Sequence, residues 1–487
     1  MKKFFALCLC AMLLMNLVAC APTGDSTDAG ENTTAAANNA DQVQVGYGKV
    51  MVTPDESVPL RGYGYTEKRM STGKWSELYL IAIAVTDTEG NTCIVISADN
   101  CSTPADVYTV AAPQIATACG ISQENIIISA IHQHSAPDLY SGVASAKRYV
   151  EKVYIPGLVS AAKMAMDDRT AATVQIQTIE TNNMNFVRRY LTKDGEYHGT
   201  EMYADTSVYV DQETDADNDL QLVKFVREGQ TTQAGKEAKD IIVANFQGHP
   251  LMGTSSKDLN IHADMPGLFR EHLENELGCE AMYISGASGN VAFSSRFAED
   301  MKSTKDFKQH GKDLAKYANS KNVEYTDIEL TAVKASKVTY TGKCNHADDH
   351  LAEKARQIYA EYKETGDESI FRKNGFESQY HCMFAYKHAD LPETRDMDIF
   401  TIAFGDLAFV GAPFEMFCET GANIKAASPF KTTVICYIAN GSNSYLPTEM
   451  AWDFYCYERH NSNFDRGTAE EVEAEFINML NGLYQQY

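Results

Sequence analysis

The strongest structural and chemical signal in this sequence lies at residues 131–137, Ile-His-Gln-His-Ser-Ala-Pro. It follows residues 125–130, Asn-Ile-Ile-Ile-Ser-Ala, an apolar run typical of a short buried strand. Side chains on a strand alternate between its two faces, so we expect His132 and His134 to point to the same side where the strand ends. Metal and ligand sites are common at such edges. For an isolated His-x-His pair, two solvent-exposed histidines are the simpler interpretation.

Three later segments each end an apolar run near a residue that can bind a metal. Residues 243–250, Val-Ala-Asn-Phe-Gln-Gly-His-Pro, place His249 after a glycine that allows close approach of the backbone. Residues 407–415, Leu-Ala-Phe-Val-Gly-Ala-Pro-Phe-Glu, end on Glu415, which we expect to open a helix and whose simplest role is to complement the helix dipole. The segment Asn-Gly-Ser-Asn-Ser-Tyr ends on Tyr445, and tyrosine is an uncommon metal ligand. Only the four segments together favour a metal site.

The N-terminus predicts a bacterial lipoprotein signal peptide over residues 1–20. Two lysines precede an apolar run, residues 4–18, which closes on Leu-Val-Ala-Cys with Cys20 as the cysteine that would receive the lipid. An ordinary cleaved signal peptide is the alternative. Residues 21–42 are rich in Ala, Asn, Thr, Asp and Gly and predict a flexible tether. We therefore expect an extracytoplasmic lipoprotein, anchored to the cell membrane through Cys20.

Residues 43–487 alternate strand-like and helix-like stretches, which predicts a single α/β domain with mixed β-sheets layered with helices. The expected strands lie at 78–85, 92–97, 125–130, 241–246, 281–284, 399–404, 407–411 and 433–439. The expected helices lie at 105–119, 265–277, 305–318, 350–362, 415–427 and 469–483. The segment 302–396 is more polar, and we expect its helices at the periphery of the domain.

The net charge and the cysteine spacing disfavour two possibilities, a nucleic-acid partner and a zinc site built from thiolates. The formal net charge is −24, which would repel nucleic acid and anionic lipid headgroups, so we expect no nucleic-acid partner. The cysteines beyond the signal peptide form no C-x-x-C pair, and a thiolate zinc site is therefore disfavoured.

Taken together, these segments resemble the neutral/alkaline non-lysosomal ceramidase family. The resemblance spans most of the folded chain and rests on residues 45–50, 53–54, 59–63, 97–99, 132–137 (similar to the family's His-Thr-His-Ser-Gly-Pro), 411–415 (similar to its Gly-x-Pro-Gly-Glu), and the tyrosine pair Tyr445 and Tyr457. It implies a ceramidase-like catalytic domain. Longer family members add a C-terminal β-sandwich, and because only about 30 residues follow Tyr457 we expect no such domain here.

The resemblance implies one zinc ion per chain, held by His132, His249, Glu415 and Tyr445. Imidazole nitrogens and carboxylate and phenol oxygens are acceptable zinc ligands, and zinc-activated water would then attack an amide carbonyl. The resemblance further implies that His134 and Tyr457 act in catalysis by moving a proton or stabilising the oxyanion. It implies that Arg188 is the family's active-site arginine, although a surface arginine fits residues 185–190 equally well.

One serine of the family is absent. The family's Gln-Ser-Asn-x-Gly-Asp segment corresponds to residues 285–290, Ser-Gly-Ala-Ser-Gly-Asn, so Gly286 stands at the serine position and Asn290 at the aspartate position. A serine nucleophile would require Ser285 or Ser288 to act from a shifted position. Zinc-activated water does not need this serine, so its loss affects ceramide as the substrate more than hydrolysis itself. A serine restored at Gly286 tests this interpretation by gain of ceramide hydrolysis.

The sequence thus predicts a surface-anchored, zinc-dependent amidohydrolase of the neutral ceramidase superfamily. Its substrate would be a small-molecule or lipid-like N-acyl compound, and a place in sphingolipid metabolism would follow from the resemblance. One alternative is a zinc hydrolase that acts on an ester or a glycan-linked substrate. The other is a non-catalytic binding lipoprotein that keeps the fold, which the residues Gly286 and Asn290 favour.

Overall fold

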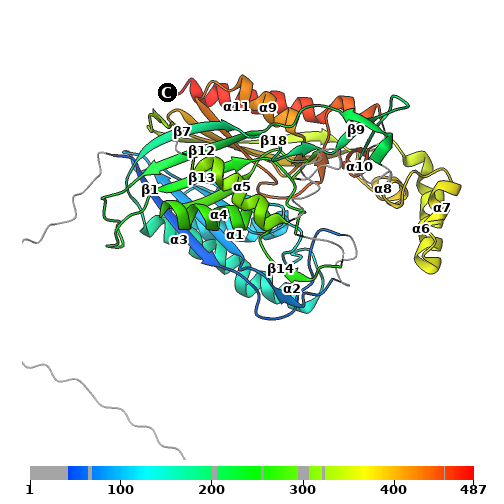
Figure 1. Ribbon diagram of the computed structural model, residues 1–487, viewed down its shortest axis with the longest axis horizontal. Helices are drawn as coiled ribbons and strands as arrows, with labels where there is room; N and C mark the ends of the chain where they lie inside the picture. Colours follow the sequence, from blue (N-terminus) through cyan, green and yellow to red (C-terminus); the bar gives the residue numbers. More distant parts are fainter. Residues whose placement is uncertain are drawn as a thin grey trace, which may run out of the picture. The chain divides into compact units, whose positions relative to one another are not determined.

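The computed structural model describes residues 42–63, 69–199, 206–253, 257–293, 306–320, 324–454 and 456–487. These residues form three main β-sheets with helices on the outer faces (Figure 1). The predicted signal peptide, Cys20 and nearly all of the tether lie outside the described residues. Within the described ranges, no helix is long and apolar enough to cross a membrane.

Two five-stranded sheets form one layer of the fold. The first has the order β5-β4-β3-β1-β6, with the bounds Ile126–Ala130, Thr92–Ala98, Tyr79–Thr86, Gln44–Met51 and Thr170–Ala171. The second has the order β15-β13-β12-β7-β17, with the bounds Glu280–Ser285, Ile241–Phe246, Asp219–Val226, Thr173–Glu180 and Thr326–Ile328. The pairs β4/β5 and β13/β15 are parallel. The edge strand β15 of the second sheet contacts β5 and β4 of the first sheet.

The third sheet packs face to face against this layer. Its order is β18-β19-β20-β22, with the bounds Val333–Lys343, Thr394–Phe404, Leu407–Gly411 and Thr432–Cys436. The interface between the layers is a continuous apolar core that includes Ile83, Val95, Phe225, Phe400 and Phe409. β20 is buried along its whole length, as expected of an apolar run without alternation.

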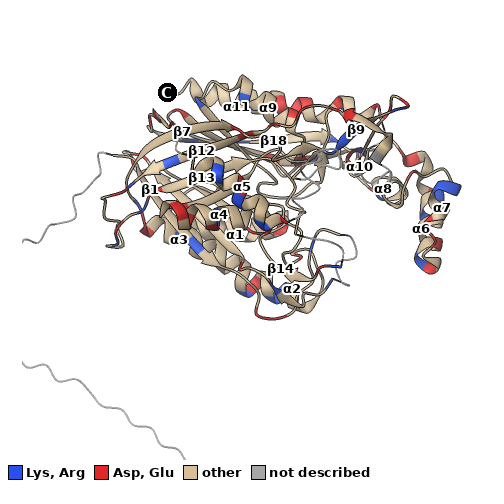
Figure 2. Cartoon of the chain, viewed as in Figure 1, with Lys and Arg blue, Asp and Glu red and all other residues tan. Residues whose placement is uncertain are grey.

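Helices cover both outer faces, which gives four layers in the order helix, sheet, sheet, helix (Figure 1). The first two sheets are covered by α1 (Ala105–Cys119), α3 (Ile155–Asp167), α4 (Asp264–Leu277) and α5 (Phe307–Ala318). The third sheet is covered by α9 (Cys418–Ala427) and α11 (Thr468–Tyr484). Figure 2 shows charged residues mainly on helices and loops, with few on the strands of the layers.

Short elements complete the described chain. The short strands are β2 (Gly73–Lys74), β8 (Phe186–Val187), β9 (Arg189–Thr192), β10 (Tyr197–Gly199), β11 (Tyr209–Gln212), β14 (Asn260–Ile261), β16 (Val291–Ala292), β21 (Glu415–Met416) and β23 (Tyr445–Leu446). The remaining α-helices are α2 (Ala144–Tyr149), α6 (Ala352–Thr365), α7 (Ser369–Lys373), α8 (Gln379–His388) and α10 (Tyr457–His460). Helices α6 and α7 lie at one end of the described fold (Figure 1).

The predicted α/β architecture is confirmed, and α1, β13 and β20 begin and end at the predicted residues. The prediction that Glu415 opens a helix is wrong. Glu415 lies in β21, and α9 begins only at Cys418. The cause is a tertiary contact, because β21 pairs in parallel with β23 and thereby sets Glu415 opposite Tyr445.

The helices of the polar segment 302–396 lie in the outer helical layer or at one end of the described fold, as predicted, but α5 and α8 each bury one face. α5 packs closely on α4, where a Cβ atom added at Gly311 would lie 3.0 Å from the Met265 carbonyl oxygen. α8, which the sequence did not predict, forms one wall of the cavity described below. Local polarity is a poor guide here, since one face of each helix is buried while the other faces solvent.

Candidate metal centre and active site

Loops that follow parallel strands meet at one edge of the layered sheets. His132 lies just beyond the end of β5, His249 just beyond β13, and Glu415 just beyond β20. Tyr445 lies in the loop region that follows β22. The carboxyl ends of parallel strands are the usual position of ligand sites in α/β sheets. The structure therefore brings together the four residues that the resemblance implied as zinc ligands.

His132 is held in an unusual backbone conformation. β5 ends at Ala130, and His132 has φ 66°, in the left-handed region, so strand alternation does not orient the two histidines as predicted. Their Nε2 atoms nevertheless lie 3.4 Å apart, on the same side. The backbone N–H of His132 donates to the Asn100 carbonyl at 2.9 Å, and its Nδ1 donates to the Cys101 carbonyl at 2.7 Å. These two bonds fix the ring so that Nε2 faces the site.

His249 is positioned by a close packing contact. A Cβ atom at Gly248 would lie 2.3 Å from the ring of Phe293, so only glycine permits this approach. The Nδ1 atom of His249 donates to the Ser288 carbonyl at 2.7 Å. Its Nε2 atom lies 3.2 Å from Oε2 of Glu415.

Tyr445 and Arg188 form the far side of the centre. The Tyr445 hydroxyl oxygen lies 3.3 Å from His249 Nε2 and accepts a hydrogen bond from Arg188 Nη2 at 3.1 Å. Arg188 is not the surface residue that the sequence left open, because it is only 7% exposed. It also donates to the Glu458 carboxylate at 2.9 Å and to the Gly289 carbonyl at 3.0 Å. Arg188 therefore orients the phenol of Tyr445 toward the two imidazoles.

The donor set fits a divalent metal ion. Because His132 and His249 both donate through Nδ1 to carbonyl groups, each presents a lone pair on Nε2 to Glu415 Oε2, at 3.2 Å in both cases. Lone pairs at this separation repel one another unless a cation lies between them. Neighbouring ligands of a tetrahedral zinc ion, with bonds of roughly 2.0–2.1 Å, stand about 3.3 Å apart. The residues present would hold Zn²⁺, with Tyr445 beside them as a fourth ligand.

Burial sets the protonation of these groups. Burial, followed by the charge of Arg188, lowers the pKa of His249 to about 4. Burial and the neighbouring His132 and His249 rings hold the pKa of His134 well below its usual value. Burial opposes ionisation of Glu415, but His132 and His249 together outweigh it and hold the pKa of Glu415 well below the usual range. Burial lowers the pKa of His132, but Glu415 and Cys101 together raise it more. In place of a metal ion, a proton on His132 Nε2 would therefore lie between these groups.

Comparisons with known proteins identify the fold around this centre. No protein-family model and no curated protein matches the sequence. The crystal structure of neutral ceramidase from Pseudomonas aeruginosa matches with a TM-score of 0.65 at 16% identity, covering 91% of this chain and 75% of that chain. The chain has a neutral ceramidase-like fold. The structure of a ceramidase complexed with C2 matches with a TM-score of 0.64 at 17% identity, covering 91% and 76% of the two chains.

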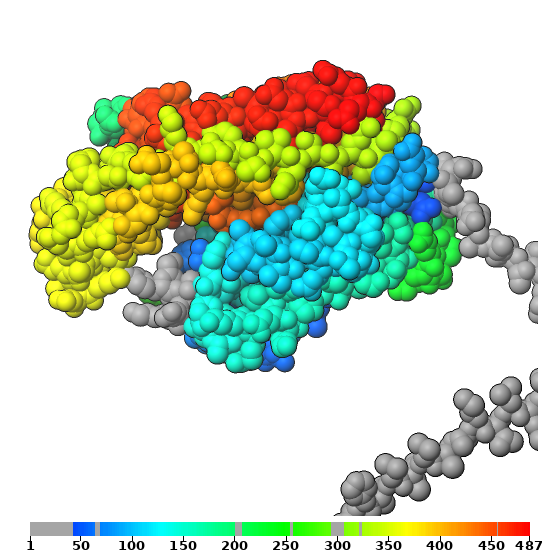
Figure 3. All heavy atoms as spheres, turned by 180° about the vertical axis from the view of Figure 1, so that it is seen from behind, coloured from blue at the N-terminus to red at the C-terminus, as the bar shows by residue number. Residues whose placement is uncertain are grey.

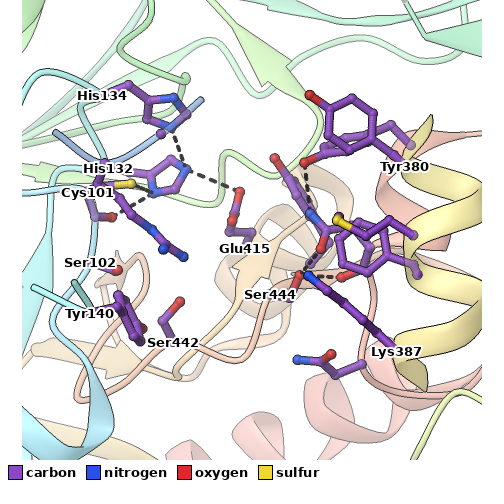
Figure 4. Close-up of a pocket in the computed structure, with 18 residues that line it drawn as sticks. Cys101, Ser102, His132, His134, Tyr140, Tyr380, Lys387, Glu415, Ser442 and Ser444 are labelled. Carbon is purple, nitrogen blue, oxygen red and sulfur yellow. Dashed lines mark hydrogen bonds and ion pairs between the residues drawn. The ribbon is translucent and has the colours of Figure 1, made fainter. Parts of the chain in front are cut away.

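In this ceramidase-like fold the centre opens into a cavity of about 770 Å³ (Figure 4). One wall is a single face of α8, which presents Tyr380, Met383, Phe384 and Lys387 at helical spacing. Figure 3 shows the surface hollowed between the yellow segment, which carries α6–α8, and the cyan segment. The spacing of these four residues was visible in the sequence, but a helix face that lines a cavity and one that packs in a core have the same pattern.

Three residues at the centre were not among the predicted site residues. The Tyr437 hydroxyl lies 3.4 Å from Glu415 Oε2. Cys101 lines the cavity, with its Sγ 3.6 Å from His132 Nδ1. Glu458 is 2% exposed and holds Arg188. Nothing local in the sequence distinguishes these residues from ordinary core positions.

Tyr457 and His134, two of the three predicted catalytic residues, both line the same cavity. Asn461 Nδ2 donates to the Tyr457 hydroxyl oxygen at 2.9 Å, and the Tyr457 ring stands edge-on to Tyr445 at 5.6 Å. His134 is packed against the backbone of Gly62, where a Cβ atom would lie 2.3 Å from its ring. The two side chains therefore reach the cavity beside the implied ligands.

The segment at the family's serine position offers no hydroxyl to the cavity. The hydroxyl of Ser285 donates to the Ile131 carbonyl at 2.9 Å, and that of Ser288 donates to the Gly286 carbonyl at 2.8 Å. A Cβ atom at Gly286 would lie 2.2 Å from Gln247 Oε1. Neither serine substitutes for the missing one. A serine placed at Gly286 would force the Gln247 amide group to move, against its hydrogen bonds to the Asp217 and Asp219 carbonyls.

A second group of metal-binding residue types lies near α8. Ligand atoms of Asp348, His381 and His460 lie within 4.8 Å of one another. The rings of His381 and His460 are stacked, with centroids 4.1 Å apart and planes 17° apart, so their in-plane lone pairs do not converge on one point. The backbone N–H of Glu377 also donates to His381 Nδ1 at 3.3 Å. This cluster fits a structural role, in which it fastens α8 to α10.

Proposed function

We propose that this protein is a zinc-dependent hydrolase that cleaves the amide bond of an N-acyl substrate. The observation that carries the proposal is the convergence of His132 Nε2, His249 Nε2 and Glu415 Oε2 beside a large cavity. Two imidazoles and a carboxylate with an open side are typical of catalytic zinc sites. The structural relatives are ceramidases, which supports hydrolysis of an N-acyl bond as the reaction class.

One zinc ion per chain would be held by His132, His249, Glu415 and Tyr445. When bound, zinc supplies a Lewis acid for the substrate carbonyl and lowers the pKa of a coordinated water to roughly 7. The chain contributes the orientation of each ligand through carbonyl groups behind the two imidazoles and through Arg188 behind the phenol.

The neighbouring side chains would move protons and stabilise charge. His134 lines the cavity beside the implied ligands, with its Nε2 3.4 Å from His132 Nε2, and would accept a proton from the attacking water and return it to the leaving amine. The Tyr457 hydroxyl oxygen accepts from Asn461, which directs the hydroxyl as a donor toward the carbonyl oxygen as negative charge develops there. The hydroxyl groups of Ser285 and Ser288 already donate hydrogen bonds to backbone carbonyls, which supports attack by water rather than by serine.

The test uses metal-loaded full chain and matched N-acyl and O-acyl substrates with the same acyl group. We expect amide hydrolysis, a loss of about 10²–10³-fold in kcat for Tyr457→Phe, and no activity for His249→Ala. Lys431→Gln, which removes a surface lysine paired with Asp406, is the control and should retain full activity. Hydrolysis of esters alone would favour the ester alternative, and zinc binding without any hydrolysis would favour the binding lipoprotein.

We also propose that Cys20 carries a lipid that holds the enzyme at the outer face of the cell membrane. The support is the signal-peptide pattern of residues 1–20. Cys20→Ser should release the protein from the membrane fraction into the medium. A variant that stays in the membrane fraction would contradict the anchor.

A further inference from the structure

The cavity carries two cationic side chains that the proposed reaction does not use. Arg61 and Lys387 both line it. Among the described residues that line the cavity, Glu415 is the one carboxylate, and it is engaged by His132 and His249. This cationic lining stands out in a chain whose formal net charge is −24.

The backbone of Arg61 is fixed beside the catalytic groups. Its N–H donates to the Ala136 carbonyl at 3.0 Å, and its carbonyl accepts from Arg69 Nη1 at 2.8 Å. The next residue, Gly62, packs on the ring of His134. The backbone of Arg61 is therefore held in a defined position next to His134, the residue proposed to transfer the proton.

The guanidinium of Arg61 keeps unused hydrogen-bond donors. Its carbon lies 4.5 Å above the ring of Tyr140, and its nearest carboxylate is Asp138 at 3.7 Å, which is beyond hydrogen-bond distance. The same Asp138 oxygen already accepts from the backbone N–H of Tyr140 at 3.1 Å. Within the described part of the chain, the guanidinium donates no hydrogen bond. A guanidinium has five N–H donors in a planar fork that matches a carboxylate.

Lys387 reaches the cavity from the last turn of α8 (Figure 4). Its Nζ lies 5.6 Å from the ring centroid of Phe384, and it forms no ion pair with any residue that the structure describes. Burial, then the nearby charges of Lys363 and Arg61, lower its pKa. Two like charges that share a cavity raise each other's energy unless an anion compensates them.

We propose that Arg61 and Lys387 bind an anionic group of the substrate, so that the preferred substrates are N-acyl compounds that also carry a carboxylate. This inference rests on the proposed function only in that the bond cleaved is an amide. The predicted preference for binding an anionic compound does not depend on the proposed function. The apolar side chains of Tyr380, Met383 and Phe384 on the same face of α8 would contact the acyl chain. A neutral ceramide-like compound would leave Lys387 without an anionic partner and Arg61 with only the ion pair to Asp138 at 3.7 Å.

The test compares two hydrolysis-resistant probes that differ in their terminal group, the anionic carboxylate of N-(dodecylsulfonyl)glycine and the neutral hydroxymethyl group of N-(dodecylsulfonyl)ethanolamine. Their affinities for the metal-loaded full chain are measured by titration calorimetry. A charge-assisted hydrogen bond contributes about 1.5–3 kcal/mol, so we expect the glycine probe to bind about 10–100-fold more tightly. Arg61→Gln and Lys387→Gln should each reduce this preference, and the double variant should abolish it. Lys363→Gln, on α6 and outside the cavity lining, is the matched control and should retain it.

Hydrolysis of N-dodecanoylglycine and N-dodecanoylethanolamine is measured in parallel. The expected result is a kcat/KM ratio that follows the binding ratio and collapses in the double variant. Equal affinity of wild type for the two probes overturns the inference, whatever the activity. A preference for the glycine probe that persists in the double variant also overturns it. Selective binding without hydrolysis of either acyl compound would instead overturn the proposed function and leave the anion site supported.

Discussion

Removal of Arg188 should destabilise the fold and loosen the metal centre together. The guanidinium is buried and bonded to Glu458, to the Gly289 carbonyl and to the Tyr445 hydroxyl, at 2.9, 3.0 and 3.1 Å. In Arg188→Met the Glu458 carboxylate would remain buried without its partner, which typically costs about 3–5 kcal/mol. Loss of the bond that orients Tyr445 should reduce zinc affinity by about 10–100-fold.

The assay combines denaturant unfolding with zinc titration against a competing chelator. Glu458→Gln and the double variant Arg188→Met/Glu458→Gln complete a double-mutant cycle. Because the double variant no longer buries a lone charge, it should be more stable than the sum of the single effects predicts, by about 2 kcal/mol or more. Additive single effects, or an unchanged zinc affinity in Arg188→Met, would refute the positioning role of Arg188.

Three further predictions concern packing and protonation. Gly286→Ser should lower the free energy of unfolding by about 1–3 kcal/mol and add no ceramide hydrolysis, because its Cβ would lie 2.2 Å from Gln247 Oε1; a stable and ceramide-active variant would disprove this. Gly62→Ala should push His134 aside and lower kcat by about 10²-fold with zinc content unchanged, whereas an unaltered kcat would argue against His134 in catalysis. Burial lowers the pKa of His310 from 6.5 to about 4, so the unfolded chain takes up a proton first and stability falls as pH drops through this window. Between pH 7.5 and 5.0 the loss should be about 2 kcal/mol smaller in His310→Gln than in wild type, as measured by denaturant unfolding; an equal loss in both would contradict it.

The parts of the fold that follow from short-range patterns could be predicted from the sequence. β13 and β20 are apolar runs bounded by polar or turn residues, and they have the expected bounds. His249 follows its strand through a glycine, and that local signal matches its place in the structure. Residues that follow the carboxyl end of a strand in a parallel sheet lie at the edge where ligands bind. The position of His249 in the site could therefore be predicted from the sequence.

Contacts between distant segments decided what the sequence could not predict. Glu415 leaves the predicted helix because β21 pairs with β23. Glu458 holds Arg188 across 270 positions of the sequence, and no local pattern links the two. From the sequence, Gly286 is interpreted as the loss of a functional serine. In the structure, the side chain of Gln247 occupies the space that a side chain at this position would need. The lining of the cavity by α8 is likewise a tertiary arrangement that helical spacing alone does not reveal.

Metal content of the purified full chain, measured by mass spectrometry after zinc loading and gel filtration, tests the central claim most directly. His132→Ala removes an implied ligand, and His350→Ala removes an exposed histidine of the segment before α6 as a control. The account predicts about one zinc per chain in wild type and in His350→Ala. It predicts none in His132→Ala, because the three remaining ligands hold the ion poorly. A folded wild type that takes up no zinc, or a His132→Ala variant that keeps full occupancy, would contradict it.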